Sequence, residues 1–114
     1  MAGKTFAEKI LGAPAGSVVF RKPDLLLTHD NTASIRKTFE KMGGSNVAFP
    51  EQLLVVLDHN APPTNSKLAT DYQYIRKTVK ELGIDKFYDA GAGICHELMG
   101  NHARPGMIIV GSDS

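Results

Sequence analysis

The chain has 114 residues, 42% of them hydrophobic and 22% charged, with a formal net charge of +1. This composition is ordinary for a globular protein, and the length predicts a single domain over residues 1–114 that can bury its own core. The charge is balanced and forms no basic cluster, and the longest apolar runs have about five residues, against roughly 20 needed to span a bilayer, which argues against nucleic acid or a membrane as partner.

Helices and strands are expected to alternate along the chain. Thr5 and Glu8 have the spacing of a capping box, and an apolar face at helical spacing runs from Leu68 to Leu82. Glycines directly after the periodic segments, such as Gly83, indicate where the helices end. The expected helices cover residues 5–11, 31–42 and 64–82. The expected strands cover residues 17–20, 25–28, 53–57, 86–89 and 107–110.

The character of the strands indicates the fold class. Every position of the run 53–57 is apolar, as is typical of a strand buried on both faces of a parallel sheet, and the run 107–110 has the same character. Strands of this kind alternating with helices predict an α/β fold. We therefore expect a three-layer-like parallel sheet with flanking helices.

Chemically capable side chains follow several of the expected strands. They are His29 and Asp30, then Asp58 and His59, then Asp113 and Ser114, with His96 in the loop after the strand at 86–89. In parallel α/β sheets, ligand sites form outside the carboxyl ends of the strands. A plainer interpretation exists for single residues, since Asp30 and Asn31 could simply cap the next helix. Recurrence at successive strand ends nevertheless predicts a site.

Paired imidazole and carboxylate groups form acid–base couples near neutral pH. Asp58 with His59, and His96 with Asp113, would supply two couples, and a protonated imidazole could give its proton to a leaving hydroxyl group. The same groups could bind a divalent metal ion, but the chain has no tight spacing such as His-x-x-x-His, and no residue is assigned as a metal ligand. The single cysteine, Cys95, excludes an internal disulfide, fits a reducing, cytoplasmic location, and is interpreted as a buried, inert thiol.

The motifs of the chain resemble, in order, those of one family. They include Leu-Thr-His-Asp-Asn-Thr at residues 27–32, Leu-Asp-His at 57–59, Gly-Ile-Cys-His at 93–96 and the segment 104–114. Together they are similar to the large subunits of isopropylmalate dehydratase, homoaconitase and aconitase over essentially the whole chain. The resemblance implies that residues 1–114 are the N-terminal portion of such a large subunit, within aconitase domain 1.

The resemblance also implies a reaction. These hydro-lyases isomerise a hydroxy-di- or tricarboxylic acid (3-isopropylmalate, homoaconitate or aconitate) by dehydration to an alkene and rehydration. A [4Fe–4S] cluster acts as the Lewis acid on the substrate. By this resemblance the catalytic residues are Asp58, His59, His96 and Asp113, and the substrate-binding residues are His29 and Ser114.

Departures from the family pattern limit what this chain can do. The three cysteines that hold the cluster, the arginines that bind substrate carboxylates and the serine base lie on later segments of the family, and Cys95 matches none of them. The chain alone is therefore expected to be inactive, with a small subunit or a C-terminal swivelling domain as candidate partner. His29, where true aconitases have glutamine, favours the isopropylmalate and homoaconitate branch, whereas Glu97, where glutamine is usual, leaves the subgroup open.

Two other functions stay open from the residues alone. One is a stand-alone divalent-metal hydrolase that uses His29, Asp58, His59, His96 and Asp113. The other is a non-enzymatic α/β module whose rim binds a partner. Metal-dependent turnover by the isolated chain would favour the hydrolase, and a specific partner bound without any small ligand would favour the module.

Overall fold

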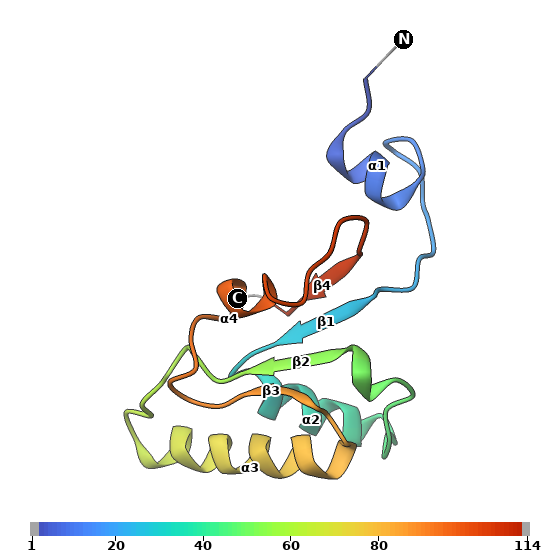
Figure 1. The fold of residues 1–114 in the computed structure, drawn as a ribbon. Coiled ribbons are helices and arrows are strands. Elements are labelled where there is room, and N and C mark those ends of the chain that lie inside the picture. Colours follow the sequence, from blue (N-terminus) through green and yellow to red (C-terminus); the bar gives the residue numbers. More distant parts are fainter. Residues whose placement is uncertain (1–2, 113–114) are drawn as a thin grey trace.

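The structure, a computed structural model, describes residues 3–112. Within this range four parallel strands form one sheet in the order β3-β2-β1-β4 (Figure 1). The strands are β1 (Leu25–Thr28), β2 (Leu53–Val56), β3 (Lys86–Tyr88) and β4 (Ile109–Gly111). The helices are α1 (Phe6–Leu11), α2 (Thr32–Lys41), the short 3-10 helix η1 (Pro50–Gln52), α3 (Ser66–Leu82) and α4 (Cys95–Met99). The predicted α/β class with a parallel sheet is confirmed; that residues 1–114 form one domain stays a prediction.

The helix ends follow the local chemistry of the sequence. The predicted capping box at α1 is present, with Glu8 N–H donating to Thr5 Oγ1 at 3.2 Å and Thr5 N–H donating to Glu8 Oε1 at 2.9 Å. The N-cap of α3 is Asn65, whose side chain accepts a hydrogen bond from Leu68 N–H. The helix ends at Gly83, which has a φ of +69°, a left-handed conformation that glycine adopts without strain.

The side chains of β2 show why the sheet needs a layer on each face. Successive residues of a strand point to opposite faces, and Val55 packs in one cluster with side chains of α2 and α3 while Leu54 and Val56 pack in a second cluster with α4. The helices α2 and α3 accordingly lie on one side of the sheet and α4 on the other (Figure 1). The three-layer arrangement expected from the all-apolar run is therefore confirmed. Among residues 3–112, no helix has the length and apolar character to cross a bilayer.

The strand order creates a switch point between β1 and β4. From β1 the chain steps outward to β2 and β3, and then returns across the sheet to place β4 on the other side of β1. Crevices at the carboxyl ends of strands on either side of such a switch point are the common ligand sites of open α/β sheets. The topology therefore directs attention to the residues that follow β1 and β4.

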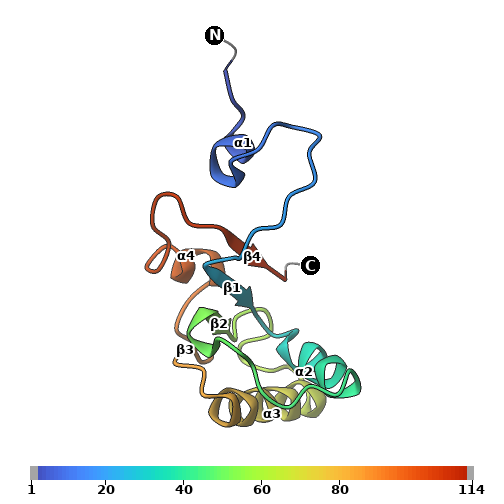
Figure 2. The ribbon, with the colours of Figure 1, turned by 90° about the vertical axis from the view of Figure 1, so that its right-hand side faces the viewer.

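The predicted strand at residues 17–20 is wrong. Val18 and Phe20 are about nine-tenths exposed, and neither belongs to a strand. The segment 17–20 follows α1 in the chain. The helix and this segment lie apart from the sheet in two perpendicular views (Figure 1, Figure 2). An apolar run alone does not specify a strand: β1, which follows this segment, is already paired with β2 and β4, and residues 17–20 pair with neither of the edge strands, β3 and β4.

Two further expectations need correction. The run at 107–110 was expected to be a buried strand, but β4 starts at Ile109 and lies at the edge of the sheet, and Val110 is 51% exposed. His96 was expected in a loop, but it lies in the short helix α4. The apolar pattern at 107–110 does not reveal that β4 has only one neighbour, and a helix as short as α4, five residues long, leaves no clear helical period in the sequence.

Candidate active site at the carboxyl ends of the strands

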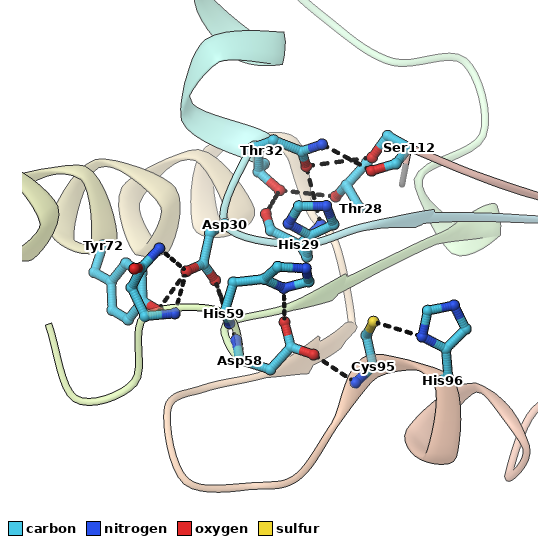
Figure 3. A network of polar contacts seen from close by, with 12 residues as sticks. Thr28, His29, Asp30, Thr32, Asp58, His59, Tyr72, Cys95, His96 and Ser112 are labelled. Carbon is cyan, nitrogen blue, oxygen red and sulfur yellow. Dashed lines mark hydrogen bonds and ion pairs between the residues drawn. The ribbon is translucent and has the colours of Figure 1, made fainter. Parts of the chain in front are cut away.

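The predicted site residues that fall within the described range gather near the carboxyl ends of β1, β2 and β4 (Figure 3). His29 follows β1, Asp58 and His59 come after β2, and His96 lies on α4. A pocket of about 30 Å³ lies at the switch point; its lining comprises Leu27, His29, Cys95, His96, Gly111 and Ser112. Asp113 and Ser114 lie outside the described residues.

Asp58 and His59 form the predicted couple. His59 Nδ1 lies 2.6 Å from Asp58 Oδ1, and the other carboxylate oxygen, Oδ2, accepts a hydrogen bond from Cys95 N–H at 2.7 Å. Burial raises the pKa of Asp58, but the hydrogen bonds from Cys95 and then from His59 outweigh it, and the net pKa is lowered. An ionised carboxylate only accepts, so His59 Nδ1 carries a proton and the chemically active nitrogen is Nε2. The His59 side chain is 37% exposed, which leaves it accessible to a small molecule.

His29 lies directly against this couple. Its ring stacks on that of His59, with the ring centroids 3.8 Å apart and an interplanar angle of 14°. His29 is 7% exposed, and neither ring nitrogen makes a hydrogen bond of regular geometry with any residue from 3 to 112, although the Ser112 main chain lies close. Burial first, and then the neighbouring imidazole of His59, lower the pKa of His29. The stack therefore places a neutral imidazole beside the Asp58–His59 couple.

His96 is exposed on α4, and its Nδ1 lies 3.4 Å from Cys95 Sγ. Cys95 itself is 2% exposed, which agrees with the interpretation of a buried thiol. The predicted His96–Asp113 couple stays a prediction, because Asp113 is outside the described range. Within that range, the Cys95 main chain links α4 to the first couple through Asp58.

Sequence reasoning gave too little weight to Asp30 and Asn31. Asn31 precedes α2 but makes no side-chain capping bond; instead its Nδ2 donates to Ser112 O at 2.8 Å and joins the ends of β1 and β4. Asp30 accepts hydrogen bonds from the loop after β2 and from Tyr72 of α3. Burial and then the Asp30 carboxylate raise the pKa of Tyr72, so its hydroxyl stays protonated and donates. The signal available in the sequence was the position of both residues directly after His29.

One group of side chains has the composition of a metal site. Ligand atoms of His29, Asp30 and His59 all lie within 4.8 Å of one another. The Asp30 oxygens, however, already accept hydrogen bonds from the loop 58–60 and Tyr72, and the stacked rings of His29 and His59 run nearly parallel, so their in-plane lone pairs do not converge. This geometry disfavours a cation held by these three residues; the stand-alone metal hydrolase, which would also use Asp58, His96 and Asp113, stays an alternative.

Comparisons with known proteins bear on the family of the chain. A sequence model of the Aconitase family (aconitate hydratase) matches residues 4–114. The chain belongs to the aconitase family. It is 39% identical over 98% of its length to the 3-isopropylmalate dehydratase large subunit 1 of Methanopyrus kandleri, and 38% identical over its full length to the 3-isopropylmalate dehydratase large subunit of Saccharolobus solfataricus. It is 34% identical over 96% of its length to the methanogen homoaconitase large subunit of Methanocaldococcus jannaschii. The α/β fold is consistent with aconitase domain 1.

The chain covers only part of the length of its relatives in the aconitase family. It spans 29% of the M. kandleri and S. solfataricus subunits and 28% of the M. jannaschii subunit, which is less than a third of each relative. Full-length members of the family are associated with an iron–sulfur cluster, which needs three or four thiolates. This chain has one cysteine, Cys95, which is buried and engaged with His96, so its own residues do not fit a cluster. The relatives named above belong to the branch that His29 favours.

Proposed function

We propose that this chain forms one wall of the active site of an iron–sulfur hydro-lyase of the aconitase family. The enzyme would isomerise a hydroxy-di- or tricarboxylic acid, such as 3-isopropylmalate or the hydroxy acids that dehydrate to homoaconitate or aconitate, by dehydration and rehydration. The observation that carries the proposal is the Asp58–His59 couple, with 2.6 Å between Nδ1 and Oδ1, beside the switch point of the sheet. The names of the relatives support the class of substrate.

The couple suits a proton donor to a leaving hydroxyl group. Asp58 orients the His59 ring by accepting a hydrogen bond from Nδ1, so that the Nε2–H of the imidazolium form would face the substrate. In the dehydration direction His59 would give this proton to the departing hydroxyl group, and in the rehydration direction it would take a proton back from water. The backbone bond from Cys95 to Asp58 holds the carboxylate in place from the opposite side.

The other predicted residues complete the wall. His29, buried and neutral, would contact the substrate and support the ring of His59 from its flat side. His96 and Asp113 would form a second couple and Ser114 a further substrate contact, as the resemblance implies. The side chains in these roles all belong to this chain, whereas the cluster and the other substrate contacts do not.

Other parts of the reaction belong outside this chain. The iron–sulfur cluster would be held by residues elsewhere, because Cys95 alone does not fit it. The large-subunit names of the relatives support a small subunit as partner, which, like the alternative of a C-terminal swivelling domain, would take part in substrate choice. The chain alone would be inactive. The cytoplasmic location stays a prediction, which cell fractionation of the source organism would test.

A chimeric enzyme tests the proposal. The matching segment of the M. kandleri large subunit is replaced by this chain, combined with the small subunit, and reconstituted anaerobically with iron and sulfide. We expect cluster absorbance and hydration of at least one of three alkenes, those derived from 3-isopropylmalate, homocitrate and citrate. A chimera that forms the cluster and assembles with the small subunit but hydrates none of them would refute the proposal.

A further inference from the structure

The Asp30 carboxylate, for which the sequence left helix capping open as one interpretation, is the centre of a hydrogen-bond cluster. It accepts five hydrogen bonds, from the N–H groups of Asp58, His59 and Asn60, from the Asn60 side chain and from the Tyr72 hydroxyl, at 2.7–3.3 Å. Within the described part of the chain none of these bonds goes to α2, whose N-cap is Asn31. Capping of the next helix therefore does not explain Asp30.

The division of these bonds between the two oxygens has a geometric consequence. Oδ1 accepts the N–H groups of two successive residues, Asp58 at 3.1 Å and His59 at 3.3 Å. Because successive amides that converge on one anion fix the orientation of the peptide between them, the directions of both side chains are set as well. These are the two side chains of the acid–base couple.

The second oxygen connects this loop to the core. Oδ2 accepts hydrogen bonds from Asn60 N–H and from the Tyr72 hydroxyl, both at 2.7 Å. Tyr72 is 1% exposed on α3 and belongs to the same core cluster as Leu57, the residue before the couple. Asp30 thus joins the end of β1, the loop after β2 and a buried position of α3 (Figure 3).

We propose that Asp30 is a positioning residue for the Asp58–His59 couple: through three main-chain amides and Tyr72 it fixes the loop so that Asp58 reaches Cys95 and His59 stacks on His29. The consequence for catalysis rests on the proposed function, whereas the positioning itself does not. Asp30 faces main-chain amides and a phenol, so it acts through the loop and does not touch the reacting atoms.

NMR spectroscopy of the 114-residue chain tests the positioning without any activity. In Asp30→Asn the neutral side chain presents an NH₂ group to donors, and we expect amide hydrogen exchange at residues 58–60 to quicken at least tenfold. Freed of its fixed partners, the Asp58 carboxyl should then titrate at a higher pH than in the wild type. The matched control is Asp89→Asn, which removes a carboxylate that follows β3 and binds Arg76 and Ala90 N–H.

The outcomes separate positioning from general loss of structure. A folded Asp30→Asn chain whose exchange at 58–60 and Asp58 titration match those of Asp89→Asn would overturn the proposal. Should Asp30→Asn fail to fold, Tyr72→Phe decides, because it removes only the hydroxyl: faster exchange at 58–60 supports the proposal and wild-type exchange sinks it. Since these measurements need no substrate, an inactive chimera would count against the proposed function and leave this result standing.

Discussion

Replacing Asp58 with asparagine perturbs a carboxylate that joins the acid–base couple to α4. The carboxylate accepts one bond from His59 Nδ1 at 2.6 Å and one from Cys95 N–H at 2.7 Å, and its side chain is 6% exposed. An asparagine oxygen can keep one of these bonds, but the amide nitrogen then faces a donor. A hydrogen bond to a charged group contributes about 1.5–3 kcal/mol, so we expect the free energy of unfolding to fall by about 2 kcal/mol at pH 7.

Urea denaturation of the 114-residue chain, followed by circular dichroism, measures this difference. The control is Asp85→Asn, at an exposed position in the turn before β3, for which a change within about 0.5 kcal/mol is expected. Because the folded pKa of Asp58 is lowered, its stabilisation is complete above the unfolded pKa, about 3.9, and is lost as the pH falls through the folded pKa. The reasoning is refuted if Asp58→Asn is as stable as the control, or if the difference persists unchanged into acid.

Three further predictions concern burial and the cofactor. The pKa of His29, lowered by burial and by His59, should give an NMR titration midpoint below the ordinary value of about 6.5. The chain should therefore lose stability as the pH falls through and below that value. A midpoint at or above the ordinary value contradicts the buried stack. Leu54→Ala should lower the free energy of unfolding by about 2–5 kcal/mol, because Leu54 is fully buried. Val18→Ala should lower it by no more than about 0.5 kcal/mol, because Val18 is 87% exposed. Equal losses would show that residues 17–20 do pack in the sheet. The chain alone, with Cys95 as its one thiol, should retain no iron and labile sulfide after anaerobic reconstitution, and stoichiometric amounts of both would contradict this.

The fold could be predicted where the local pattern is sufficient. The helix α3 and its end at Gly83 follow from periodicity and from one glycine, and the run 53–57 is apolar throughout because β2 is central and buried on both faces. The run 17–20 is also short and apolar but forms no strand, because a strand needs a partner strand and the local pattern does not specify one. Strand order is a property of contacts between distant segments, and a single sequence does not record it.

The same limit applies to the site. Asp58 and His59 are neighbours in the sequence, so their pairing was predicted and the structure brings them to 2.6 Å. The stack of His29 on His59, and the bond from Tyr72 to Asp30 across 42 positions, depend on the register of β1 against β2 and on how α3 packs. Sequence reasoning could therefore name the rim residues but not the arrangement that makes Asp30 a support for the couple.

The most direct test of the central claim compares two histidines in the chimeric enzyme. With saturating alkene, His59→Gln should lower kcat by about 10²–10⁴-fold, the range for loss of a general acid–base group. The control is His102→Gln, which changes a histidine that contacts Tyr88 outside the couple and should alter kcat by less than about threefold. If His59→Gln retains kcat within the range of the control, with cluster content equal in both, the Asp58–His59 couple is not the proton-handling group and the account is contradicted.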